Sequence, residues 1–113
     1  MELLKGSLLG AIDEDLYRSC VLTTYSIDPG FIDMRVVPFL RSSGVRNVML
    51  LADGDMLAAA LEKHSRSGHI NHPGCGLWPI YQDKGVFHPK VVLCMGAQHG
   101  LLGVGSGNLT AAG

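Results

Sequence analysis

The sequence contains few charged residues and no long hydrophobic run. Charged residues occupy 17% of the 113 positions, and the formal net charge is -1. Because 47% of the residues are hydrophobic, the composition excludes a disordered chain, and near-neutrality offers no broad electrostatic footprint for nucleic acid. No apolar run approaches the ~20 residues of a membrane helix, and acids occur within the first fifteen positions. We therefore expect neither a membrane contact nor a secretory signal.

Cysteine is also sparse. The three cysteines, Cys20, Cys75 and Cys94, are odd in number and far apart, unlike the dense, even set of a secreted disulfide scaffold. This usage indicates a reducing, cytoplasmic compartment. Cys20 and Cys94 each lie inside an apolar run, which predicts buried, unreactive thiols.

The length fits one domain over residues 1–113, and the hydrophobic pattern predicts its elements. Apolar spacing predicts helices over about 7–17, 29–43 and 54–67, and a further helix beginning in the last residues. Runs rich in β-branched and aromatic residues predict strands over 20–27, 45–52, 77–81, 87–95 and 101–105, the last two forming a hairpin. The alternation of helix and strand predicts an α/β domain, with a mixed, mostly parallel sheet flanked by helices.

Several residues mark where these elements begin and end. Asp28, before a proline, is expected to cap the second helix, which Pro38 kinks or shortens and Gly44 ends. Asp53 or Asp55 is expected to cap the third helix, whose buried stripe comprises Met56, Leu57, Ala60 and Leu61. The strand over 45–52 is almost continuously apolar, so we expect both its faces to be covered.

The stretch FHPKVVLCMGAQHGLLGVGSGNLT carries the clearest chemical pattern. His88 and Lys90 are two positions apart on a predicted strand, so their side chains are expected on one face. Ser106 and Asn108 follow in a Gly-Ser-Gly-Asn turn, where a strand gives way to a predicted helix whose free amides suit a phosphate. An imidazole supplies a nucleophile, a lysine neutralises phosphoryl oxygens, and Ser and Asn donate hydrogen bonds to a growing charge.

This pattern resembles the phospholipase D superfamily, whose signature is His-x-Lys followed by Gly-Ser-x-Asn. The match is most similar to the nuclease- and helicase-associated branch, as are the upstream segments YSIDPGF, VRNVMLLAD and WPIY. The family's aspartate position holds Met95 here, and nine residues rather than six separate Met95 from Gly105.

The resemblance implies a metal-independent phosphodiesterase, nuclease-like, with no cofactor and with DNA or another nucleic acid as substrate. It implies that His88 forms a phosphohistidine, that Lys90 and Asn108 bind the phosphate, and that Ser106 is a supporting donor. It also implies a second motif, supplied either by an identical subunit in a homodimer or by a further half of a longer chain, of which 1–113 is one phospholipase D-like half.

Two other interpretations stay open from the sequence. The substitution at Met95 and the single motif favour a non-catalytic module that binds phosphate or nucleic acid within a larger helicase- or restriction-associated system. Alternatively, the chain is a zinc-binding interaction domain. Its ligands would be the ring nitrogens and the sulfur of His64, His69, His72 and Cys75, whose spacing suits zinc.

Four further residues have plain interpretations. Trp78 and Tyr81 are expected to pack in the core around a short strand, although either ring could instead stack on a base. Pro79 between them predicts that this strand lies at an edge. His99 is expected to be a solvated residue of the hairpin turn.

Overall fold

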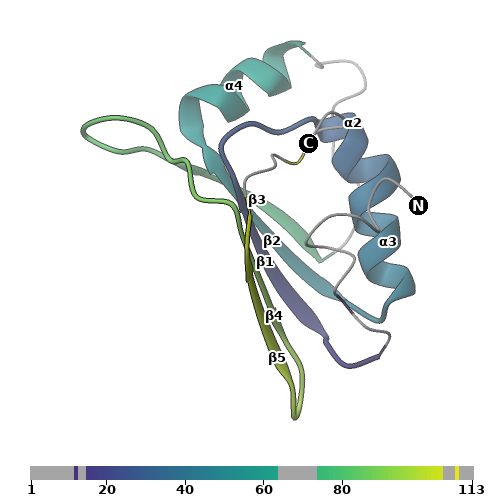
Figure 1. Ribbon diagram of the computed structural model, residues 1–113. Helices are drawn as coiled ribbons and strands as arrows, with labels where there is room; N and C mark the ends of the chain where they lie inside the picture. Colours follow the sequence, from purple (N-terminus) through teal and green to yellow (C-terminus); the bar gives the residue numbers. More distant parts are fainter. Residues whose placement is uncertain (1–11, 13–14, 64–73, 106–108, 110–113) are drawn as a thin grey trace.

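We describe a computed structural model of the chain, in which residues 12, 15–63, 74–105 and 109 are placed (Figure 1). Ser106, Asn108, His64, His69 and His72 lie outside the described residues, as do most of the first and last predicted helices. Within the described stretches, no helix combines the length and apolar character needed to cross a bilayer.

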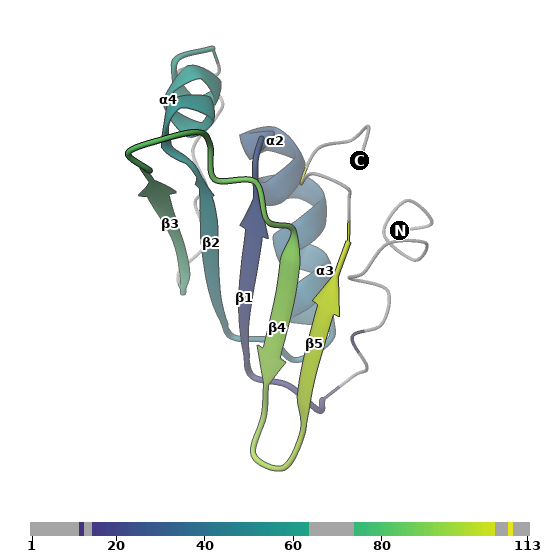
Figure 2. The same ribbon diagram turned by 60° about the vertical axis from the view of Figure 1, so that its left-hand side comes forward.

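Five strands form one sheet in the order β3-β2-β1-β4-β5 (Figure 2). The strands are β1 Ser19–Thr24, β2 Asn47–Asp53, β3 Cys75–Ile80, β4 Val91–Met95 and β5 Gly100–Val104. β1, β2 and β3 are parallel neighbours, whereas β4 runs antiparallel to β1 and forms a hairpin with β5. The expected α/β layering, the hairpin and the edge position of β3 are confirmed, but the sheet is half parallel and half antiparallel rather than mostly parallel.

The helical stretch between β1 and β2 consists of α2 Pro29–Phe31, the π-helical turn η2 Ile32–Val36 and α3 Val37–Ser42. Asp28 caps it as predicted, because its Oδ1 accepts the Phe31 amide at 3.2 Å. Pro38 does not shorten the stretch. It follows the π turn, whose wider winding accommodates a residue that has no amide to donate. Gly44 ends the helix with a φ of 93°, a conformation that glycine adopts without strain.

The second helix, α4 Gly54–Lys63, connects β2 to β3. Its Leu57 is buried as predicted, whereas Leu61 is exposed and does not belong to the buried stripe. The predicted first helix is wrong over its last residues: Asp15 and Leu16 form a turn, and Asp15 has a φ of 61°. The remainder of that prediction falls mostly outside the described residues.

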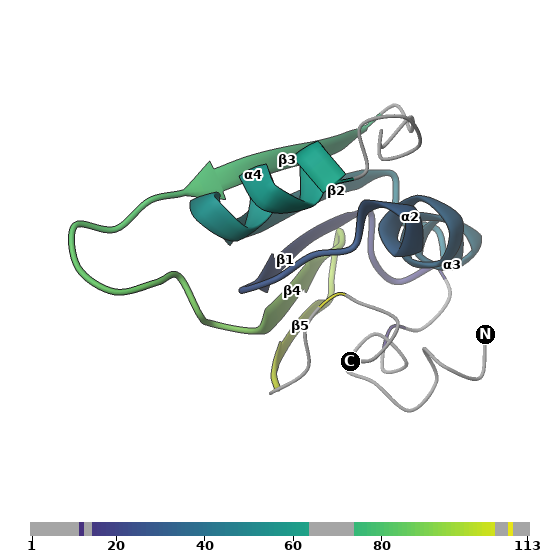
Figure 3. The same ribbon diagram turned by 90° about the horizontal axis from the view of Figure 1, so that it is seen from above.

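The core lies between the helices and one face of the sheet, which Figure 3 shows from above. Alternate residues of β1, β2 and β4 point into it and meet the apolar side of the helical stretch. The fully buried members of the hydrophobic core cluster are Cys20, Leu22, Ile32, Val36, Val37, Leu40, Val45, Leu50, Ala52 and Cys94. Burying a side chain such as Leu22 contributes roughly 1.5–3 kcal/mol to folding, so this layer dominates the stability of the described fold.

Two cysteines meet inside this core. Cys20 and Cys94 are directly opposite each other on β1 and β4, and their sulfur atoms are 3.2 Å apart. Both are buried free thiols, as predicted. The hydrogen bond to Cys94, followed by burial, raises the pKa of the Cys20 thiol far above its ordinary value.

No described helix covers the other face of the sheet, which Figure 2 shows in front of the helices. Met49 is 41% exposed on that face, Trp78 50% and Leu102 67%. The expectation that β2 is covered on both faces is therefore wrong for the described chain: its continuous apolar run has one buried set of residues and one open set. The expected core packing of Trp78 and Tyr81 is wrong as well, since both rings are half exposed or more.

Candidate functional site

The candidate site lies at the edge of the sheet that is formed by strand ends, not along an edge strand. At this edge β1, β2, β3 and β5 end and β4 begins (Figures 1 and 2). His88 and Lys90 are placed there, in the extended segment directly before β4. The prediction that they lie on a strand is wrong, because β4 starts only at Val91. Pro89 offers a reason: it has no amide hydrogen with which to continue a ladder.

A threonine hydroxyl replaces the missing ladder bonds. Thr23 Oγ1 donates to the Pro89 carbonyl at 2.8 Å and accepts the Val91 amide at 2.8 Å. These two bonds fix the main chain on both sides of Lys90. The segment that carries the predicted motif is thereby attached to the last residues of β1, although it is not itself a strand.

The structure brings His88 and Lys90 into direct contact, as their spacing predicted. Lys90 Nζ is 2.7 Å from His88 Nδ1 and 3.2 Å from Nε2. An ammonium can only donate, so the ring nitrogen that it contacts accepts a hydrogen bond. The imidazole is exposed to solvent, whereas Lys90 is only 8% exposed.

An aromatic ring lies against the imidazole. The ring centroids of Tyr25 and His88 are 4.9 Å apart, with the planes tilted by 32°. Tyr25 directly follows β1, so the same strand that fixes the main chain of the motif also supplies this contact. Sequence reasoning placed Tyr25 only in a strand, because nothing in the local pattern connects it with a histidine more than 60 residues later.

The second half of the motif is attached to the same edge. The Gly105 amide donates to the Lys90 carbonyl at 2.9 Å. The Leu109 amide donates to Thr24 Oγ1 at 3.1 Å, and the Leu109 carbonyl accepts the Asp28 amide at 3.1 Å. Ser106 and Asn108 themselves lie outside the described residues, so their role as phosphate ligands stays a prediction. The described residues on either side of them are bonded to the end of β1 and to Lys90.

A buried carboxylate, that of Asp53, accepts a hydrogen bond from the segment that carries His88. Asp53, the last residue of β2, is 5% exposed. Its Oδ2 accepts the Met56 amide at 3.2 Å, which confirms Asp53 as the cap of α4, and its Oδ1 accepts the Phe87 amide at 2.9 Å. The cap was predicted from the sequence, but the second bond, which connects β2 with the residue before His88, was not.

The position at which the family has aspartate lies far from this edge. Met95 is the last residue of β4 and pairs with Ser19 at the start of β1. At ~3.3 Å per strand residue, it is ~15 Å along the strand from Lys90. The lack of an acid at this position therefore removes no group from the surroundings of His88.

The zinc interpretation finds no support in the part of the chain that the structure describes, where no three histidine, cysteine or acidic residues lie close enough together to hold a metal ion. Of its four residues only Cys75 is described, as the first residue of β3. Burial raises the pKa of the Cys75 thiol, which disfavours the thiolate that zinc requires.

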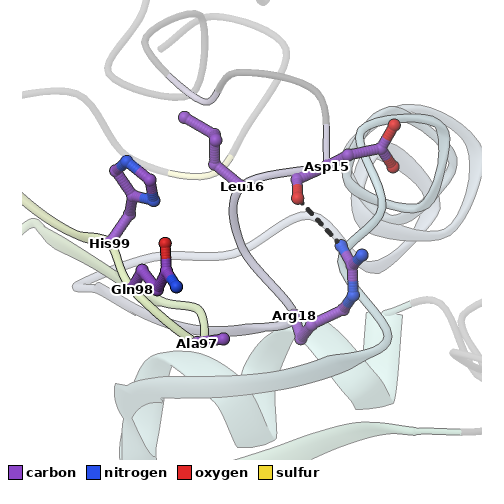
Figure 4. Close-up of a pocket in the computed structure, with 6 residues that line it drawn as sticks. All are labelled: Asp15, Leu16, Arg18, Ala97, Gln98 and His99. Atoms are coloured by element: carbon purple, nitrogen blue, oxygen red, sulfur yellow. Dashed lines mark hydrogen bonds between the residues drawn. The ribbon is translucent and has the colours of Figure 1, made fainter.

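A hollow of about 260 Å³ lies at the opposite edge of the sheet, next to the hairpin turn (Figure 4). Its lining consists of Asp15, Leu16, Arg18, Ala97, Gln98 and His99. Arg18 Nη1 donates to the carbonyl oxygens of Asp15 at 3.3 Å, Tyr17 at 3.3 Å and Gly44 at 3.5 Å. The guanidinium thus connects the segment before β1 with the turn at Gly44. His99 is exposed in the turn, as predicted.

Comparison with family models, with curated proteins and with solved structures gives no match to this chain. The resemblance to the phospholipase D superfamily therefore rests on the sequence patterns described above. The described geometry of that motif is the contact of His88 with Lys90 and the attachment of Gly105 and Leu109 to the same edge.

Proposed function

We propose that the chain is a phospholipase D-like half that cleaves phosphodiesters, nuclease-like, through a phosphohistidine on His88. The observation that carries the proposal is the state of Lys90. Lys90 is only 8% exposed as a residue, its ammonium contacts the His88 imidazole, and no described carboxylate pairs with it. Because buried charges in proteins are normally paired, such a lysine beside an exposed imidazole favours an anion as ligand.

A phosphate would change the contact between the two side chains. While Lys90 donates to His88 Nδ1, that nitrogen is occupied and the neutral ring carries its proton on Nε2. A phosphoryl oxygen is a charged acceptor and competes for the ammonium, which leaves a bare ring nitrogen beside phosphorus. In this proposal Lys90 holds the imidazole in place before the substrate binds and then stabilises the phosphoryl charge.

The reaction has two displacements. A nitrogen of His88 attacks phosphorus, a P–N bond forms and the bond to the leaving oxygen breaks, with a protonated second imidazole giving its proton to that oxygen. Water then attacks phosphorus and loses a proton to the second imidazole, and the P–N bond breaks. Asn108 and Ser106 are proposed to donate hydrogen bonds to the phosphoryl oxygens. The second imidazole is proposed to be His88 of another copy, or a histidine of a second half in a longer chain.

The test is hydrolysis of a single-stranded oligonucleotide and of a chromogenic phosphodiester by the full chain in EDTA. We expect turnover in EDTA and a radiolabelled phosphoryl group retained on the wild-type protein, stable in alkali and lost in acid. His88→Ala should abolish both. His99→Ala, which removes an exposed histidine at the opposite edge, is the matched control and should keep both.

Two outcomes would contradict the enzymatic proposal. Activity that disappears in EDTA and returns with Mg²⁺ would exclude the phosphohistidine route, and full activity of His88→Ala would exclude His88 as the nucleophile. Binding of phosphate or oligonucleotide that needs Lys90, without turnover at any protein concentration, would instead support the scaffold module.

A further inference from the structure

We infer that Thr23 and Tyr25 are positioning residues of the His88 site, which the sequence pattern of the motif does not contain. The two residues stand on either side of Thr24 at the end of β1 and act on different parts of the same segment. For its catalytic consequence the inference rests on the proposed function, whereas the contacts themselves do not.

Thr23 fixes the main chain. Its hydroxyl is both donor and acceptor, to the Pro89 carbonyl and from the Val91 amide, each at 2.8 Å. Pro89 directly follows His88, and Val91 directly follows Lys90. Because both are bonded to Thr23, the main chain of the motif has little freedom to shift. The bond from the Val91 amide is partly buried, so water replaces it less readily than the exposed bond to the Pro89 carbonyl.

Tyr25 restricts the orientation of the His88 imidazole. An exposed histidine side chain ordinarily samples several rotamers, and the aromatic contact at 4.9 Å favours the rotamer that meets Lys90. Thr24, between the two, accepts the Leu109 amide and so attaches the far side of the second motif half. Three consecutive residues, the last two of β1 and the one that follows it, therefore contact the segments that this proposal brings to a phosphate.

The alternation of the strand explains why these two residues act together. Thr23 and Tyr25 are two positions apart, and the buried Thr24 points to the core side. The outward residues at the end of β1 therefore meet the segment that begins β4, which pairs with β1 in antiparallel register. Displacing reactive groups by about 1 Å can lower a rate by on the order of 100-fold.

The test compares Thr23→Val, which keeps the shape and removes the hydroxyl, with Thr23→Ser, which keeps the hydroxyl. We expect Thr23→Val to lower kcat on the order of 10–100-fold while KM rises by no more than several-fold, and Thr23→Ser to restore most of the rate. Ser19→Ala, at the far end of the same strand, is the control and should behave as wild type. Thermal unfolding of each variant verifies that the fold is kept.

Three measurements judge the inference without turnover. Amide exchange at Val91 should accelerate in Thr23→Val but not in Thr23→Ser. The ring-proton signals of His88 should move in Tyr25→Leu, which loses the aromatic ring current, and much less in Tyr25→Phe. Inorganic phosphate, titrated against those signals, should bind Thr23→Val several-fold more weakly than wild type.

The failures of the two proposals are distinguishable. Absence of hydrolysis by the wild-type chain overturns the proposed function alone, because the exchange and phosphate measurements still report on Thr23 and Tyr25. Wild-type exchange at Val91, wild-type phosphate affinity and wild-type kcat in Thr23→Val would overturn the positioning inference alone. Unchanged His88 signals in Tyr25→Leu would remove Tyr25 from it.

Discussion

The two ends of the sheet each hold a cation and an exposed histidine, but they use the cation differently. At the hairpin end, Arg18 donates to three backbone carbonyls and so completes the hydrogen bonding of the turns around it. At the other end, the described partner of the nearly buried Lys90 is the imidazole of His88. The first cation is satisfied by the protein itself. The second is held by a neutral ring that an anion could displace.

This contrast teaches that exposure and residue type alone do not identify a site. His99 and His88 are both exposed, and both follow turns that contain glycine. Only His88 is contacted by a lysine and by an aromatic ring. The difference lies in the charge balance around the ring, and the first two predictions below each change one end while the other serves as its reference.

The largest effect is expected from the two histidines. His88→Ala should lower phosphodiester turnover by at least ~10³-fold, because it removes the nucleophile, whereas His99→Ala should stay within about twofold of wild type. Steady-state hydrolysis in EDTA measures both. Equal losses in the two variants would mean that the ends of the sheet do not differ in the way described.

A smaller effect is expected from the two cations. Lys90→Met should weaken phosphate binding ~10–100-fold while keeping or raising the melting temperature, since it removes a buried charge that lacks a described carboxylate partner. Arg18→Met should do the reverse, leaving phosphate affinity unchanged and costing about 1 kcal/mol of unfolding free energy through the carbonyls that it abandons. Calorimetric phosphate titration and denaturant unfolding separate the two. A loss of phosphate affinity in Arg18→Met would contradict the contrast.

The comparison also explains what could be predicted from the sequence. The elements with strong local signals were predicted: β1 and β2 from their apolar runs, the cap by Asp28 and the hairpin of β4 and β5. The start of β4 was not, because it depends on the bonds of Thr23 with residues 66 and 68 positions away, which no local pattern reports. The sheet's open face was missed for a similar reason, since an apolar residue such as Met49 has the same pattern whether or not a helix covers it.

The site was predicted in part. The contact of His88 with Lys90 follows from a spacing of two in an extended segment, which holds whether or not the segment is a strand. Tyr25 and the second bond of Asp53 depend on how distant segments meet at the sheet edge. Chemistry-bearing pairs close in sequence were therefore predictable, whereas the residues that position them were not.

A comparison of two glycines sharpens the account of the hairpin end. A Cβ at position 96 would collide with the Leu16 backbone carbonyl, whereas one at Gly100, four residues on, would meet only the Cys94 carbonyl at 3.8 Å. Gly96→Ala should therefore lower the free energy of unfolding by about 2 kcal/mol, and Gly100→Ala by much less. Denaturant unfolding measures both. Equal stability of the two variants would show that the segment before β1 does not pack against this turn as described.

The smallest effect is expected from alkaline pH and concerns the core beneath both ends. The Cys94 thiol and burial raise the pKa of Cys20, so the folded chain keeps a proton that the unfolded chain loses above about pH 9. The unfolded state then binds fewer protons, and the free energy of unfolding falls as pH rises, by up to about 1.4 kcal/mol per unit for one such group. The same hydrogen bond lowers the pKa of the Cys94 thiol, which opposes this fall below about pH 9. Cys20→Ala should be less stable than wild type at pH 7. It should lose less stability between pH 8 and 10, because the variant has no thiol at position 20 to keep a proton in the folded state. Parallel slopes for wild type and Cys20→Ala in urea unfolding over this range would show that the buried thiol pair does not hold the proton.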